Sequence, residues 1–312
     1  MKKNLVLIIC LWLISACDFK PGGGRNNETP DKILQLRLKP AVGASYDYRI
    51  SNETKTEFDA DNETIESTNK TDYTVNYSIN KDSSGNFLVD IQYKKIHIYQ
   101  KKNDEESDLD ADNTESSDPV ERMLAALKDA RITATINPSG EVMKVSGYQQ
   151  IPDQFLSQLN NIDPNARMAA QKQWQQLIEN NLVKKNIDRL FKMFPDSAVH
   201  MGDKWKMAYK EAGDINFAVK DFFTLKSVED GKAIVESSGR ISTDSSASAI
   251  MGYQVNSNLK GTQKVEYEIA IGSGMMENCK VTSAIEGTLN VMGREIPVSI
   301  NIEIKIKGSE IR

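Results

Sequence analysis

The sequence has few of the residues that build catalytic and metal centres. Its 312 residues include three cysteines and two histidines. His97 and His200 each lack a second histidine or cysteine at zinc-binding spacing, which argues against a His/Cys zinc site. A Ser-His-Asp triad would need one of these histidines, and the sequence has no Gly-x-Ser-x-Gly motif and no Gly-Lys-Ser/Thr phosphate loop. We therefore predict no catalytic residue and no cofactor.

Scarce cysteine also limits cross-linking. Cys10 lies inside an N-terminal leader and Cys17 ends it, so Cys279 would carry the one free thiol of the mature chain. No intramolecular disulfide could then form, and an exported domain would depend on its packed core. Because no base or basic cluster adjoins Cys279 in the sequence, we expect a half-buried strand residue and not a nucleophile.

Positive charge is in the minority. Lys and Arg number 39 against 44 Asp and Glu, a formal net charge of -5. Without the two lysines of the leader the balance is 37 against 44, or -7. A chain of this charge repels nucleic acid and anionic head groups, so neither is expected as a partner.

The N-terminus has the pattern of a secretory leader. Two lysines precede an apolar run at residues 5–13, which is too short for a transmembrane helix. Residues 14–17 read Ile-Ser-Ala-Cys, which resembles the lipobox of bacterial lipoproteins. The resemblance implies diacylglyceryl transfer to Cys17, cleavage after Ala16, and acylation of the new N-terminus by a fatty acid such as palmitate. Residues 1–16 are then the signal peptide and 17–33 a flexible tether.

From residue 34 onward, apolar residues alternate with polar ones. Such alternation predicts strands with one buried and one wet face, which is typical of antiparallel sheets. Turn sequences rich in Asp, Asn and Gly separate the alternating stretches and favour hairpins. The clearest alternating sets are Tyr73, Val75, Tyr77 and Ile79, and Ile300, Ile302, Ile304 and Ile306.

The middle of the chain follows a helical period. Asp163 suits an N-cap and Pro164 the first turn, and Pro195 ends the pattern, so residues 151–195 are predicted as a helical segment. Its apolar face could hold an apolar ligand against the sheet, or could simply complete the core. The residues of this face are Trp174, Leu177, Ile178, Ile187, Phe191 and Phe194.

Three blocks of the first half resemble three blocks of the second half in the same order. The pairs are residues 42–46 and 201–205, 70–75 and 219–225, and 132–147 and 265–287. We therefore predict an α+β fold, mostly antiparallel β-sheet, in two related modules with a central helical segment. The modules would span residues 34–150 and 196–312, in one curved sheet or in two sandwiches.

Two motifs extend the resemblance to known proteins. Residues 195–205 read Pro-x-x-x-Val-x-x-Gly-Asp-x-Trp, and residues 140–147 read Gly-x-Val-x-Lys-Val-x-Gly. With the lipobox, they resemble a family of uncharacterised bacterial lipoproteins, which implies architecture and location only. The predicted architecture is also loosely similar to lipoprotein carriers, in which helices close a curved sheet over an apolar cavity; fold alone does not give function.

An acidic loop at residues 103–118 is the remaining candidate site. Asp108, Asp110 and Asp112 have the spacing that begins a calcium-binding loop, but Asn113 and Pro119 stand where glycine and glutamate are usual. We favour a solvated loop over a weak calcium site and predict no metal.

The sequence thus favours a non-enzymatic, lipid-anchored binding or assembly protein of the cell envelope, in the outer membrane, with its face undecided. Its partners would be the membrane, through the lipid on Cys17, and an apolar ligand or an envelope protein. The alternatives are a scaffold or accessory subunit of an outer-membrane protein complex and a carboxylate-based hydrolase. No carboxylate pair for a hydrolase can be identified.

Overall fold

The structure is a computed structural model that describes residues 33–311 except 61–62, 82–83, 114, 117, 149–163, 165–167, 169–170, 172–186, 188–189, 192, 212–214, 244–247 and 251–252. The first half has the elements β1 (Ser45–Ala60), β2 (Glu63–Lys81), β3 (Phe87–Lys102), β4 (Glu105–Asp110), α1 (Pro119–Asp129), β5 (Ile132–Ile136) and β6 (Val142–Ser146). The second half has β7 (Lys204–Glu211), β8 (Phe217–Glu229), β9 (Lys232–Thr243), β10 (Ser248–Ile250), β11 (Tyr253–Ala270), β12 (Met276–Val291) and β13 (Arg294–Ile311).

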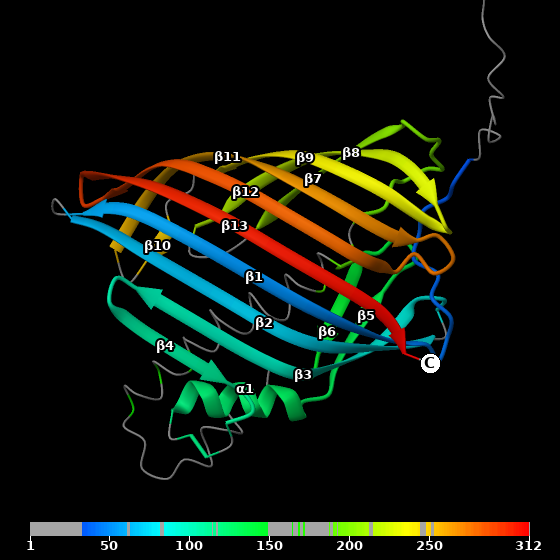
Figure 1. The fold of residues 1–312 in the computed structure, drawn as a ribbon, viewed down its shortest axis with the longest axis horizontal. Coiled ribbons are helices and arrows are strands. Elements are labelled where there is room, and N and C mark those ends of the chain that lie inside the picture. The colour runs from blue at the N-terminus through cyan, green and yellow to red at the C-terminus, as the bar shows by residue number, and fades with distance from the viewer. Residues whose placement is uncertain are drawn as a thin grey trace, which may run out of the picture. The chain divides into compact units, whose positions relative to one another are not determined.

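The strands join in one sheet of thirteen strands, which Figure 1 shows to be curved. Along the sheet the order is β6-β5-β3-β2-β1-β13-β12-β11-β9-β8-β7, with β4 paired to β3 and β10 paired to β11. Every pairing is antiparallel, as the alternating sequence predicts.

The prediction of an α+β fold in two β modules is wrong. β1, which opens the predicted first module, pairs with β13, which closes the second, from Ser45 opposite Ile311 to Phe58 opposite Val298. This long ladder joins the edges at which two separate modules would end, and unpaired edges are unfavourable. In the described part of the chain α1, with 11 residues, is the one helix whose bounds are defined. The fold is therefore mostly β, in a single sheet.

Read in one direction across the sheet, the strands on each side of β13 run from the last to the first of their half of the chain. The order is β6-β5-β3-β2-β1 on one side and β12-β11-β9-β8-β7 on the other. Gly43 and Gly202 precede the first strand of each series, and both have a φ of 88°, a conformation that favours glycine. Each donates its N–H to the second strand of its series, to the carbonyl of Ile79 at 2.8 Å and of Leu225 at 2.7 Å. The similar blocks around these glycines thus form the same turn.

One face of the sheet carries the buried side chains and is called the inner face; the opposite face is called the outer face. On β2, Tyr73, Val75, Tyr77 and Ile79 are buried on the inner face, as their alternation predicts. Tyr77 packs edge-on against Tyr48 of β1, with ring centroids 5.5 Å apart. Large aromatic side chains therefore form much of this core.

Helix α1 packs against β3 and β4. Asp118 caps it by accepting the backbone N–H groups of Val120 at 2.7 Å and Glu121 at 3.4 Å, and Pro119 occupies the first turn. Its buried face completes the core beside these strands and consists of Val120, Met123, Leu124 and Leu127.

An extended segment at residues 34–39 ties the two halves together. Its leucines are buried: Leu34 forms a bridge with Val199, and the N–H of Leu38 donates to the carbonyl of Pro138 at 3.0 Å. The N–H of Lys39 donates to the carbonyl of Ser273 at 2.8 Å. Pro138 and Ser273 belong to the corresponding turns that precede β6 and β12. The segment at residues 34–39 is therefore hydrogen-bonded to both turns.

The predicted helical segment is described only at isolated positions. Those with helical backbone are Pro164, Met168, Gln171, Ile187, Leu190 and Phe191. Among the described residues, none forms part of a helix long and apolar enough to span a bilayer.

Candidate functional site

A row of polar side chains crosses the inner face in the middle of an apolar surface. We call it the polar seam; it consists of Ser283 on β12, Gln263 on β11 and Asp221 on β8, with Gly239 of β9 between the last two. The register places Gln263 opposite both Ser283 and Gly239, and Gly239 opposite Asp221. The seam is therefore continuous across four strands.

Hydrogen bonds link the members of the seam. The Ser283 hydroxyl donates to Gln263 Oε1 at 3.2 Å, and Gln263 Nε2 donates to the two Asp221 carboxylate oxygens at 3.3 and 3.2 Å. The Tyr209 hydroxyl donates to Asp221 Oδ2 at 3.1 Å. Asp221 is only 1% exposed, and burying a carboxylate is costly unless donors of this kind satisfy it.

The seam separates two apolar clusters. The large cluster includes Tyr48, Tyr77, Phe223, Val265, Val281 and Ile304. The small cluster consists of Val219, Ile241, Leu259, Ile285 and Val298. Successive inward positions pass from the large cluster to the seam to the small one, from Val281 through Ser283 to Ile285 on β12 and from Phe223 through Asp221 to Val219 on β8.

Three further polar atoms lie beside the seam. Asn52 Oδ1, Ser237 Oγ and Trp205 Nε1 are buried and have no hydrogen-bond partner among the described residues. All three belong to the cross-strand row next to the seam: Trp205 lies opposite Phe223 and Phe223 opposite Ser237, while Asn52 lies opposite Ile304 in the same row. The inner face therefore offers hydrogen-bonding groups at a defined line between apolar surfaces.

Sequence reasoning missed Asp221, although a signal was present. Val219, Asp221, Phe223 and Leu225 alternate, and the three apolar members predict an inward face for the whole set. An aspartate at an inward strand position is unusual and marks a buried polar site.

The residues predicted to face a ligand are only partly described. Ile187, Phe191 and Phe194 are buried within the large cluster, and the Phe191 ring packs edge-on against Tyr77 at 5.9 Å between centroids. These three side chains therefore contact the core of the sheet. Trp174, Leu177 and Ile178 lie outside the described residues.

The carboxylates of the acidic loop do not converge. Residues 105–110 form the strand β4; Asp108 contacts His97 Nε2 at 2.5 Å, and Asp112 pairs with Lys128. Asp110 Oδ1 accepts the backbone N–H of Asp112 at 2.8 Å. In the described parts of the chain, no group of three His, Cys, Asp or Glu side chains is arranged to hold a metal ion.

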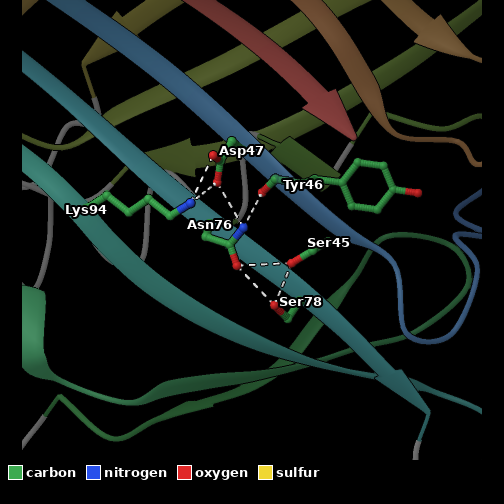
Figure 2. Close-up of polar contacts among 6 residues, drawn as sticks. All are labelled: Ser45, Tyr46, Asp47, Asn76, Ser78 and Lys94. Atoms are coloured by element: carbon green, nitrogen blue, oxygen red, sulfur yellow. Dashed lines mark hydrogen bonds and ion pairs between the residues drawn. The ribbon is translucent and has the colours of Figure 1, made fainter. Parts of the chain in front are cut away.

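A second polar network lies on the outer face, where Figure 2 shows Lys94 reaching Asp47. Lys94 Nζ donates to the two Asp47 oxygens at 2.8 and 2.9 Å, and Asn76 Nδ2 donates to Asp47 Oδ1 at 2.9 Å. Burial acts to raise the pKa of Asp47, but the hydrogen bonds from Lys94 and Asn76 and the charges of Lys94 and Arg49 outweigh it and lower that pKa. Asp47 therefore stays ionised and neutralises Lys94.

The model of one protein family matches residues 84–276, which is more than half of the chain. The chain belongs to a family of unknown function, DUF6263. No curated protein matches its sequence. The family relationship thus agrees with the expected resemblance to uncharacterised proteins and assigns no activity.

Among solved structures, the chain is similar to lipovitellin, in a structure concerned with lipid–protein interactions. The identity is 9% and the TM-score 0.50, over 87% of this chain and 25% of the lipovitellin chain. The chain thus spans about a quarter of the length of lipovitellin. An outer membrane channel from Pseudomonas putida F1 (7% identity, TM-score 0.23, 87% of this chain and 97% of the channel) is too dissimilar to support an argument. The likeness to lipovitellin indicates a related sheet architecture.

Proposed function

We propose that the chain is a non-enzymatic, membrane-anchored binding protein of the cell envelope that holds an amphipathic ligand against the inner face of its sheet. The apolar part of the ligand contacts the small cluster, and its polar part lies at the polar seam. The observation that carries the proposal is the seam itself, with its buried carboxylate between two apolar surfaces.

The physical argument follows from what binding sites require. Ligand sites are mostly apolar and contain a few placed polar groups that fix orientation. The small cluster supplies apolar area, while Gln263, Ser237 and Asp221 supply donors and acceptors beside it. A purely structural interior has no need of a buried aspartate, because apolar residues there would stabilise the fold at lower cost.

Two other observations support the proposal without testing it. The similar fold of lipovitellin belongs to a protein whose structure concerns lipid–protein interactions, so this sheet architecture is compatible with lipid. The lipobox-like residues 14–17 support a lipid anchor at Cys17, with residues 17–33 as the tether to the domain. Together they favour a lipid-type ligand taken up next to a membrane.

The experiment compares two isoleucines on the inner face. Ile285 belongs to the small cluster and Ile304 to the large one, and both are 3% exposed. Ile285→Ala and Ile304→Ala should each lower the free energy of unfolding by about 2–5 kcal/mol. Native mass spectrometry of the intact protein and displacement of a fluorescent polyene fatty acid then measure binding.

We expect only Ile285→Ala to weaken binding of the fatty acid, by roughly tenfold for about 1.4 kcal/mol of lost contact. Asp221→Asn keeps the shape of the side chain and removes its charge, so it should change which head group is preferred and leave the chain-length preference unaltered. Ligand-free protein that never takes up the probe, or equal losses in the two alanine variants, would rule out a ligand at the small cluster.

A further inference from the structure

Basic side chains gather at one end of the outer face. Thr74 of β2 lies opposite both Lys95 of β3 and Arg49 of β1, and Arg49 lies opposite Lys307 of β13. Lys95, Arg49 and Lys307 therefore form one line across four strands, called here the basic row. With adjacent strands about 4.8 Å apart, the row is about 15 Å long.

The basic row lines an open hollow of 400 Å³. Lys305 and His97 also line it, and Asp72 is its one carboxylate. Lys305 pairs with Glu303 at 3.0 Å, whereas the three members of the row form no ion pair with any described residue. All three are exposed, so their charges act on whatever approaches this end of the sheet.

A β-bulge explains why β3 contributes Lys95 to the row. The register of β2 and β3 shifts between Thr74 and Val75, so Lys94 and Lys95 both lie outward although they are consecutive. Asp47 neutralises Lys94 (Figure 2). Lys95 forms no such ion pair with a described residue, and it lies across Thr74 from Arg49.

A second hollow, farther along the outer face, has the opposite charge. A hollow of 310 Å³ there is lined by the carboxylates of Glu57, Asp59 and Glu286, and no cation lines it. Arg49 and Glu57 are eight residues apart on β1, or about 26 Å along the strand. The two hollows therefore have opposite charge, positive beside Arg49 and negative beside Glu57.

The described chain begins near the basic row. Strand β1 starts at Ser45, four residues before Arg49, and the segment at 34–39 runs beside the start of the strand series. Ile33 lies sixteen positions after Cys17, and that length of chain spans up to about 55 Å when extended. A lipid on Cys17 can therefore reach a bilayer that the basic row faces.

We infer that the basic row docks on the anionic head groups of the bilayer that carries the Cys17 anchor, and so orients the domain with its acidic hollow away from the membrane. The inference rests on the anchor in the proposed function and is independent of the ligand. This inference departs from the expectation, drawn from the net charge alone, that anionic head groups are not a partner. At physiological salt, charges more than about 8 Å away are largely screened, so the local positive charge of the basic row acts on the surface it faces. Each exposed Lys or Arg near an anionic surface strengthens partitioning about fivefold.

The test uses the full chain with Cys17→Ser, so that no acyl chain contributes to binding. One variant adds Arg49→Gln, Lys95→Gln and Lys307→Gln. A matched control adds Lys220→Gln, Arg240→Gln and Lys260→Gln, three exposed outer-face cations elsewhere on the sheet that change the net charge equally. Sedimentation with vesicles of phosphatidylcholine, with and without about a third phosphatidylglycerol, measures partitioning.

We expect the parent chain and the control to bind the anionic vesicles, and the basic-row variant to bind on the order of a hundredfold more weakly. Added salt should weaken the parent's binding, and displacement of the fluorescent fatty acid should be the same in all three proteins. Equal binding by the basic-row variant and the control would overturn the docking. So would release by inorganic phosphate at an ionic strength where sodium chloride has no effect, since the hollow would then be a site for a soluble anion. The docking would also be overturned if the parent chain and the control were dimers in solution and the basic-row variant were a monomer. That result would show that a second copy of the chain covers the row.

Discussion

Gly239 and Asp221 lie opposite each other on β9 and β8, and the glycine leaves the space that the buried carboxylate occupies. A Cβ atom on Gly239 would overlap Asp221 Oδ1. Because Asp221 is held by Gln263 and Tyr209, its carboxylate cannot simply turn aside. The polar seam thus depends on a residue that has no side chain.

This relationship predicts a coupled response to mutation. Gly239→Ala should lower the free energy of unfolding by about 1–3 kcal/mol, as overpacking does. In a chain that also carries Asp221→Ala the same change should cost clearly less, because the overlapping oxygen is gone. Urea denaturation of the four proteins measures the coupling, and strictly additive losses would contradict the packing described.

Two glycines with positive φ should differ in their tolerance of alanine. Gly202 has a φ of 88° and open space where a Cβ atom would lie, whereas Gly274 has a φ of 70° and its Cβ would overlap the carbonyl of Arg37. Gly202→Ala should cost about 1–2 kcal/mol from backbone strain alone. Gly274→Ala should cost about 1–3 kcal/mol more, because the segment at 34–39 must move.

Thermal unfolding followed by circular dichroism compares these two variants directly. Limited proteolysis near residue 37 adds a second readout, since only Gly274→Ala should loosen that segment. Similar unfolding midpoints for both variants, with no new cleavage, would mean that the segment at residues 34–39 is not tightly packed against the turn at Gly274.

Glu121 gives the fold a predictable response to acid. The backbone N–H of Asp110, which donates to Glu121 at 2.8 Å, acts with hydrogen bonds from Ser116 and Asn113 to lower the pKa of Glu121 below its ordinary 4.5, against the effect of burial. A lowered pKa in the folded state stabilises the fold above the unfolded pKa, and this stability disappears as the pH falls through the folded value.

Glu121→Gln should therefore cost about 1–2 kcal/mol at neutral pH, the order expected for hydrogen bonds to a charged group. The difference from the parent should shrink as the pH falls below 4.5, where the carboxyl of the unfolded parent is protonated. Denaturation midpoints measured from neutral pH to about pH 3 check the sign. A difference that grew toward acid would show that the carboxylate is not the stabilising form.

The lipid anchor makes its own prediction. In a host that processes lipoproteins, Cys17→Ser should remove the acyl mass from the mature protein and release the chain from the membrane fraction. Cys10→Ser, which changes a cysteine inside the leader, should leave both unchanged. Intact-mass measurement and membrane fractionation decide, and acyl groups that persist in Cys17→Ser would place the modification elsewhere.

Local pattern predicted the strands and their faces well. Tyr77 and Ile79 are buried where their alternation places them, and the turn glycines Gly43 and Gly202 adopt the same conformation in their similar blocks. These features depend on neighbours in the sequence, and a period of two specifies them without knowledge of the rest of the fold.

Long-range pairing was not accessible in this way. No local property of Ser45 indicates that Ile311 lies opposite it. The same alternation of apolar and polar residues is therefore expected for two separate modules and for one sheet. The basic row was hidden for the same reason, because Lys95, Arg49 and Lys307 are distant in sequence and meet only through the register of three ladders. Asp221 differs, since its own strand carried the signal.

The pairing of the first strand with the last has a consequence for how the chain folds. Phe58 pairs with Val298, 240 residues later, so the centre of the sheet cannot form until β13 has been synthesised. Contacts between such distant residues slow folding and leave the edges of β1 and β12 open to other chains in the interval. Loss of β13 would consequently split the sheet through its middle and leave β1 and β12 as unprotected edges prone to aggregate.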